Sequence, residues 1–330
     1  MSNALSRRRF ITISAGVVTA SLVPGAASMA SPSSVRWQGQ AMGAEASLIL
    51  NHPDQQKAEA ALQVVQDEIS RLEKVFSLYD HGSALSALNR AGLLNQPPLD
   101  LVRCLDDAAH ISRLTNGAFD VTVQPLWDLY ARHFAASPAP LSGPTATDIA
   151  GATKLVDFNA VHFDARSVSL AKSGMKVTLN GIAQGFITDR VGELLRAQGF
   201  DNLLISLGET RGFGGRVDGS DWRVGIKAAD GSGRITQKID LRDKAIATSG
   251  GYGTRFSSDG HYHHLFNPKT GKSANRWASI SVIADDATRA DALSTAFSNL
   301  PEAAIRTIAK RLKVTVYASA GPSAAPELIS

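Results

Sequence analysis

A single cysteine, Cys104, is the feature that most limits how this 330-residue chain can fold. One thiol excludes an internal disulfide framework and any zinc or iron–sulfur site built from several cysteines. Stability must therefore come from a hydrophobic core, and 44% hydrophobic content over this length is enough to bury a large one. Cys104 lies in an apolar helical pattern, so we interpret it as a core residue; a nucleophilic thiol is the less favoured alternative.

The N-terminus has the pattern of an export signal. The run Arg7-Arg8-Arg9 precedes Phe10, an apolar stretch covers residues 11–23, and small residues allow cleavage before Ser31. Paired arginines of this kind predict passage through the twin-arginine (Tat) export machinery into the periplasm. A retained anchor is the alternative, but the apolar stretch is too short to span a bilayer. Residues 1–30 are therefore predicted to be a signal peptide.

The basic charge of the chain belongs to this signal. The full chain has 34 Lys+Arg against 30 Asp+Glu and a formal charge of +4. Residues 1–30 contain no charged side chain besides the three arginines, and removing those leaves 31 Lys+Arg against 30 Asp+Glu. A nearly neutral mature chain does not have the electrostatic footprint of a nucleic-acid-binding protein. We expect no nucleic-acid partner.

Hydrophobic periodicity predicts an α+β protein. Apolar residues three or four positions apart predict helices over 58–76, 99–114, 187–195, 290–297 and 305–312. Short apolar or alternating runs predict strands over 44–50, 177–179, 203–207, 222–227 and 280–284. We expect one compact catalytic domain over residues 31–318. A surface insertion rich in Ala, Ser and Pro is expected at 135–151, and a frayed tail at 319–330.

A glycine-bearing turn, Asn180 to Gly185, is predicted to follow a strand and to begin a helix. A helix N-terminus presents free N–H groups and the positive end of the helix dipole, which suit an anion. An ordinary strand–helix turn explains the same residues. The chain has neither a Walker loop nor a Gly-x-Gly-x-x-Gly fingerprint at such a junction, so common nucleotide folds are not indicated.

Two further clusters contain groups that could take part in catalysis. Asp291 and Thr295 are four residues apart and share one helical face; their hard oxygen atoms suit Mg²⁺, although a solvent-exposed pair is equally simple. His261, His263 and His264 are compatible with a zinc site, with a single general base, or with a polar hairpin. These alternatives stay open on the residues alone.

The order of several motifs along the chain is more specific than any one of them. The motifs are Met42-Gly43, Ser77-Leu78-Tyr79, residues 83–89, residues 115–123, residues 180–185, Thr248-Ser249-Gly250, residues 264–271 and residues 290–296. This series resembles the FAD:protein FMN transferases of the ApbE family. The arginine signal, Phe-Ser-Leu-Tyr and Val-Gln-Pro-Leu-Trp are most similar to its NosX branch, which serves nitrous oxide reduction.

The resemblance implies a fold, a reaction and a set of site residues. It implies an ApbE-like fold with mixed or antiparallel sheets and packed helices. Such enzymes cleave FAD, attach FMN through a phosphoester to a Thr or Ser of another protein, and release AMP. By position, Asp291, Thr295 and the carbonyl of Gly181 match the family's Mg²⁺ ligands, and His264 matches the candidate base. The implied FAD contacts are Met42, Tyr79, Ala118, Phe119, Asp120, Thr178, Gln184 and Leu265.

The sequence departs from the common family pattern at several positions. Thr178 and Gln184 stand where charged residues are common, Glu209 replaces an Asp after Gly, and Asn267 replaces the Asp before Pro268. The branch implies a NosR-type membrane protein as acceptor, flavinylated on its periplasmic flavin-binding domain. The departures keep two alternatives open, which are an FAD carrier without transfer activity and a metal-dependent FAD pyrophosphatase.

Overall fold

The computed structural model describes residues 16–17, 34–136 and 140–330. The predicted signal peptide lies outside these residues, apart from a two-residue strand. The helices are α1 (Gln55–Phe76), α2 (Ala84–Ala91), α3 (Leu99–Leu114), α4 (Gln124–Phe134), α5 (Ala146–Thr153), α6 (Ala183–Ala197), α7 (Ala287–Phe297) and α8 (Glu302–Leu312). The strands are β1 (Gly16–Val17), β2 (Ser34–Ala41), β3 (Ala44–Asn51), β4 (Leu93–Asn95), β5 (Val161–Phe163), β6 (Ser167–Leu170), β7 (Leu203–Leu207), β8 (Thr210–Phe213), β9 (Trp222–Lys227), β10 (Ile235–Leu241), β11 (Lys244–Gly250), β12 (Ser279–Ala284), β13 (Thr315–Ser319) and β14 (Glu327–Leu328).

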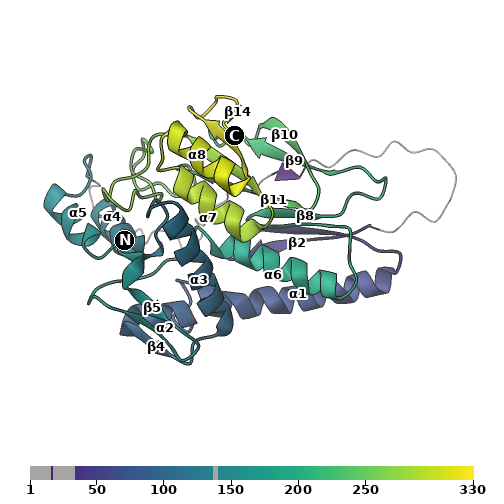
Figure 1. Cartoon of the computed structure of the whole chain (residues 1–330), viewed down its shortest axis with the longest axis horizontal. Helices are drawn as coiled ribbons and strands as arrows, with labels where there is room; N and C mark the ends of the chain where they lie inside the picture. The colour runs from purple at the N-terminus through teal and green to yellow at the C-terminus, as the bar shows by residue number, and fades with distance from the viewer. Residues whose placement is uncertain (1–15, 18–33, 137–139) are drawn as a thin grey trace.

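An antiparallel sheet of eight strands forms the centre of the fold, in the order β14-β13-β12-β11-β8-β7-β3-β2. Two three-stranded sheets, β1-β9-β10 and β4-β6-β5, accompany it. Helices α1, α6 and α7 cover one face of the large sheet, and the β9–β10 hairpin lies over the other (Figure 1). Because both faces are covered, every residue of β7 is buried.

Side-chain alternation in β7 shows how the two faces are filled. Leu203, Ile205 and Leu207 point into the large core under the helices, whereas Leu204 joins a smaller cluster with Trp222 of the hairpin. This period of two is the ordinary consequence of the pleat. The central sheet is thus anchored on both sides and gives a rigid base for the loops at its edge.

The segment between α1 and α6 gathers at one end of the molecule (Figure 1). Helices α2 to α5 and the small β4-β6-β5 sheet lie there, and α4 packs on the loop segment 251–276. Tyr130 of α4 is buried with Phe266 in this contact, and its hydroxyl donates to the carbonyl of Gly271 at 3.1 Å. The contact holds the loop segment between α4 and the central sheet.

The α+β class, the antiparallel sheets and the single compact domain agree with the sequence-based expectation. The predicted helix 99–114 coincides with α3, and the predicted strands 203–207 and 222–227 coincide with β7 and β9. None of the helices in the described part of the chain is long and apolar enough to cross a membrane.

Two local expectations were wrong, and a third segment contains a helix that its composition did not indicate. Residues 177–179 form no strand although Val177 and Leu179 are buried, because the Val177 amide donates to Asn89 Oδ1 instead of to a neighbouring strand. The segment 135–151 contains most of α5, a helix without a buried residue, whose half-buried Ile149 packs on the aromatic residues around Tyr130. The tail at 319–330 is not frayed, since β14 pairs with β13 and Ile329 is buried.

Candidate active site

Every site residue predicted from the sequence lines one of two adjoining hollows beside the central sheet. Met42 lines the second hollow, and the other predicted residues line the first. Tyr79, Asn180 and Gln184 line both, so the two hollows form one elongated site. The segments that contribute to it run from the β2–β3 turn to α7 and meet only in the folded chain.

Met42 lies in a strained turn. The pairing of Ala41 with Ala44 leaves Met42 and Gly43 as a two-residue hairpin loop, and their φ angles are 49° and 77°. A loop of this type requires positive φ at both positions, which is costly for a methionine. The Met42 amide donates to Glu73 Oε1 at 2.6 Å, which holds the turn against α1. The turn thereby places Met42 at the wall of the second hollow.

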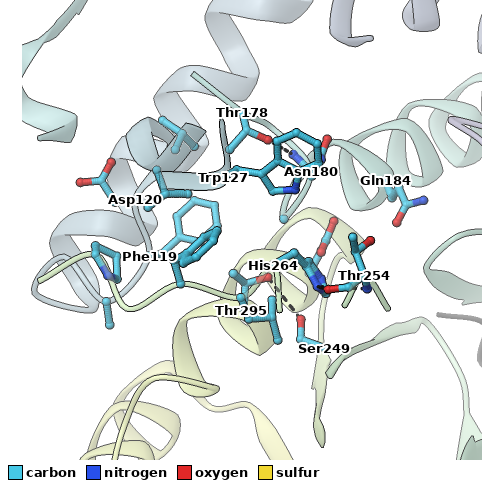
Figure 2. Close-up of a pocket in the computed structure, with 18 of the residues that line it drawn as sticks. Phe119, Asp120, Trp127, Thr178, Asn180, Gln184, Ser249, Thr254, His264 and Thr295 are labelled. Carbon is cyan, nitrogen blue, oxygen red and sulfur yellow. Dashed lines mark hydrogen bonds between the residues drawn. The ribbon is translucent and has the colours of Figure 1, made fainter. Parts of the chain in front are cut away.

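The end of α3 directs Phe119 into the site. Asn116 and Gly117 have positive φ, and the Gly117 amide donates back to the Ser112 carbonyl, which ends the helix. Asp120, which follows, is buried, and its carboxylate accepts from the Thr122 and Phe158 amides. Figure 2 shows the Asp120 carboxylate directed away from His264 and Thr295. Asp120 therefore shapes this wall of the first hollow by binding backbone groups.

Two close contacts bring the start of α6 against α7. A Cβ on Gly181 would lie 2.8 Å from Thr295 Oγ1, and one on Gly185 would lie 2.3 Å from the Ala287 carbonyl oxygen. Only glycine allows these approaches. The Gly185 amide donates to Asp291 Oδ2 at 3.1 Å. The start of α6 has no side-chain cap. The amides of residues 180, 182, 183 and 185 donate to protein oxygens, so within the described residues only those of Gly181 and Gln184 are left without an acceptor in this turn.

A group of oxygen atoms surrounds Asp291. Ser249 Oγ lies 3.2 Å from Thr295 Oγ1, and Glu209 also lines the hollow (Figure 2 shows Ser249 and Thr295). Asp291 and Glu209 are 4% and 5% exposed. Burial raises the pKa of Asp291 to about 7, and burial together with the charge of Asp291 raises the pKa of Glu209 well above its usual range.

These donors fit a divalent cation. No salt bridge within residues 34–136 and 140–330 involves Asp291 or Glu209, so the charge of both carboxylates lacks a cationic partner there. Carboxylate, hydroxyl and carbonyl oxygens are hard ligands that suit Mg²⁺. Asp291, Thr295 and Gly181 line the same hollow, and their carboxylate, hydroxyl and carbonyl groups are of the types that could hold such an ion. The described residues contain no group of three or more His, Cys, Asp or Glu that could bind a metal.

His264 lines the same hollow from the loop segment 251–276. Its Nδ1 lies 3.2 Å from both the amide nitrogen and the carbonyl oxygen of Thr254, which holds the ring from behind. Burial, and then the neighbouring His263, lowers the pKa of His264 to about 4, so the imidazole is neutral at pH 7. When Nδ1–H donates to the Thr254 carbonyl, Nε2 has a free lone pair and can accept a proton.

The departures from the family pattern have visible roles. Thr178 Oγ1 accepts from the Asn180 amide at 3.3 Å and so shapes the turn before α6. Gln184 packs on Gly208, where an added Cβ would lie 2.5 Å from the Gln184 side chain. Asn267 Oδ1 accepts from the amides of Lys269 and Thr270, as an aspartate would. The turn after His264 is therefore preserved.

Sequence reasoning missed several residues that line the first hollow. Thr254 was not singled out at all. Trp127, Asn180 and Ser249 were named only as members of motifs, and Glu209 only as a departure. Trp127 stands on α4 between the buried Leu126 and Tyr130, so its periodicity is that of a core residue. Ser249 belongs to a buried strand, where a hydroxyl gives no signal of its own. Only their position at the hollow in the folded chain distinguishes these side chains from ordinary core residues.

Comparison with known proteins places the chain in a family. The sequence profile of the ApbE family matches residues 42–318, and the chain belongs to this family. It is 30% identical over 253 residues to the FAD:protein FMN transferase of Haemophilus influenzae, which covers 73% of this chain and 72% of that one. The flavin transferase ApbE of Vibrio cholerae is similar in structure, with a TM-score of 0.75, 25% identity, and 90% and 96% of the two chains covered. The ApbE protein of Thermotoga maritima gives a TM-score of 0.76 at 27% identity, covering 87% and 94%.

Proposed function

We propose that this protein is an exported, Mg²⁺-dependent FAD:protein FMN transferase. It cleaves FAD, attaches FMN through a phosphoester to a Thr or Ser of a target flavoprotein, and releases AMP. The observation that carries the proposal is the elongated site itself. Residues from Met42 to Thr295 meet around two adjoining hollows that suit a ligand with two ring systems joined by phosphates. The family membership and the relatives' names support the same reaction.

The reaction needs a nucleophile, a proton acceptor and a site for the pyrophosphate. The acceptor hydroxyl attacks the phosphorus of the FMN half, a new O–P bond forms, and the P–O bond to AMP breaks. His264 Nε2 takes the hydroxyl proton, because the ring is neutral at pH 7 and lines the hollow. The amides of Gly181 and Gln184, which have no acceptor among the described residues, bind phosphate oxygens at the start of α6. Asp291, Thr295 and the carbonyl of Gly181 would hold a divalent cation, which would neutralise the charge of the pyrophosphate.

The cellular setting forms the second part of the proposal. The Arg7-Arg8-Arg9 run and the apolar segment after it support export by the Tat machinery to the periplasm. The motifs shared with the NosX branch support a NosR-type membrane protein of nitrous oxide reduction as the acceptor. The acceptor hydroxyl then lies on the periplasmic flavin-binding domain of that protein.

One incubation tests the reaction. The protein is mixed with FAD, Mg²⁺ and the periplasmic domain of the acceptor, and the denatured acceptor is examined for flavin fluorescence and for the mass of one added FMN. Covalent FMN on one Thr or Ser, with an equal amount of AMP, supports transfer. Free FMN and AMP without labelling indicate a pyrophosphatase. Bound, intact FAD indicates a carrier, and either result overturns the proposal.

Localisation is tested separately. A fusion of residues 1–40 to a reporter that must fold before export should reach the periplasm, and replacement of Arg8 and Arg9 by lysines should retain it in the cytoplasm. Export of the Lys-Lys variant at the wild-type level would contradict the twin-arginine route. The experiment also shows whether the signal is cleaved before Ser31.

A further inference from the structure

Glu209 stands on a rigid turn beside the metal-binding residues. It occupies the short connection between β7 and β8, where the Leu207 amide donates to the Glu209 carbonyl at 3.0 Å. Gly208 has a φ of 96°, a conformation that favours glycine, and the Gln184 side chain packs directly on it. The turn is therefore fixed both by its backbone and by α6. Its geometry leaves little freedom for Glu209 to turn away from the hollow.

The Glu209 side chain is buried without a compensating positive charge. It is 5% exposed, lines the first hollow together with Asp291, and accepts a hydrogen bond from the Thr248 amide. No Lys, Arg or His forms a salt bridge with it in the described residues. Two buried carboxylates that share one hollow repel each other unless a proton or a cation lies with them. The surroundings of Glu209 therefore favour the uptake of a cation.

We infer that Glu209 is a positioning residue for the divalent cation, whose carboxylate increases the affinity of the Asp291–Thr295 site for the ion. The inference deepens the proposed function and rests on the metal site assigned there. Its basis is the placement of a second buried carboxylate on the wall that contains Asp291. The number of negatively charged oxygens around a hard cation is a main determinant of its dissociation constant. Substitution of a residue that orients metal ligands without itself binding the metal typically changes that dissociation constant by about 10–100-fold.

The test compares the full chain with its Glu209→Gln variant. The glutamine keeps the shape and can still accept from the Thr248 amide, but it removes the charge. Binding of Mn²⁺ is measured by electron paramagnetic resonance and Mg²⁺ by calorimetry, with and without FAD. We expect the dissociation constants of both ions to rise about 10–100-fold, whereas Glu209→Asp should recover most of the affinity.

A second readout separates this role from a structural one. Without metal, Glu209→Gln removes repulsion with Asp291, so its melting temperature should equal or exceed that of the wild type. A residue needed only for folding would lower it. Asp107→Asn is the charge-matched control, because Asp107 lies on α3 outside both hollows and should leave metal affinity unchanged.

Several outcomes overturn the inference. These are a metal affinity of Glu209→Gln within twofold of the wild type, an equal loss in Asp107→Asn, and an absence of Mn²⁺ binding to the wild type in both conditions. The measurement does not use an acceptor protein. A wild type that binds the ion tightly but labels no acceptor would therefore refute the proposed function and leave the role of Glu209 standing.

Discussion

Two buried aspartates near the same end of α7 have very different surroundings. The carboxylate of Asp189, on α6, accepts from the amides of Ala287 and Thr288, from the Thr288 hydroxyl and from the Arg211 guanidinium. Asp291, one turn further along α7, accepts only from the Gly185 amide among the described groups. Both are almost fully buried. Burial alone thus does not distinguish a structural carboxylate from a functional one; the number of partners does.

Two adjacent histidines repeat the contrast. His263 is 2% exposed, accepts from the Leu265 amide at Nδ1 and is bonded through Nε2 to Asn275 Oδ1, so both ring nitrogens are occupied. His264 lines the hollow and is held at Nδ1 alone. In each pair, the residue whose polar atoms are satisfied supports the fold. The other retains bonding capacity for a ligand.

The largest effect is expected from Asp291→Asn. Loss of the metal-binding carboxylate should abolish acceptor labelling, because the charge of the pyrophosphate is no longer neutralised. FAD binding should largely survive, since the remaining walls of the hollows are unchanged. Labelling is measured by flavin fluorescence of the denatured acceptor, and FAD binding by calorimetry. Full activity of the variant, or of the wild type after removal of Mg²⁺ with a chelator, would refute the metal assignment.

His264→Asn should reduce labelling by about 100- to 10,000-fold, the range of a lost general base. In the wild type, the pKa of His264 is lowered to about 4. With Mg²⁺ at a saturating concentration that keeps Asp291 ionised, the labelling rate should therefore stay flat near pH 6.5 and fall only toward pH 4. The unfolded chain takes up this proton first, near pH 6.5, so the folded state loses stability as the pH falls from about 6.5 to about 4. The variant should lack this part of the stability profile. A rate that halves near pH 6.5 would contradict the assignment.

Asp189→Asn, in contrast to Asp291→Asn, should lower stability and leave metal binding and labelling nearly unchanged. It breaks a buried ion pair and weakens the start of α7, and we expect a loss of about 3 kcal/mol in the free energy of unfolding. Under conditions where the variant is folded, its Mn²⁺ affinity and labelling rate should stay within a few-fold of the wild type. Urea denaturation provides the stability. A loss of metal affinity as large as that of Asp291→Asn would remove the distinction between the two aspartates.

The smallest effect is expected from His263→Gln. The ring bonds to the Leu265 amide and Asn275 are lost or weakened, which should cost about 1–2 kcal/mol of stability. The turnover rate at saturating FAD should not change, because His263 does not line either hollow. Thermal melting and labelling kinetics on one preparation provide both values. A rate loss equal to that of His264→Asn would show that the two histidines act together.

Local structure was largely predictable from the sequence. The periodicity of residues 99–114 predicted α3 with its observed bounds, and the spacing of Asp291 and Thr295 predicted a shared helical face. The apolar run at 203–207 predicted a buried strand in the same way. Such patterns depend on the repeat of the helix or the pleat of the strand, which neighbouring residues determine among themselves.

The composition of the site depended on the tertiary structure. Glu209 and Asp291 lie far apart in the chain and line one hollow, because α7 packs on β11 and β12 and so comes beside the β7–β8 turn. Trp127, Ser249 and Thr254 belong to it for the same reason. Trp127 and Ser249 lie within motifs of the sequence, but no local pattern showed that their side chains enter the site. The sequence alone determined which side chains can bind a metal, a proton or an aromatic ring. Long-range strand pairing and helix packing decided which of them meet, and whether each is left with an unsatisfied polar atom.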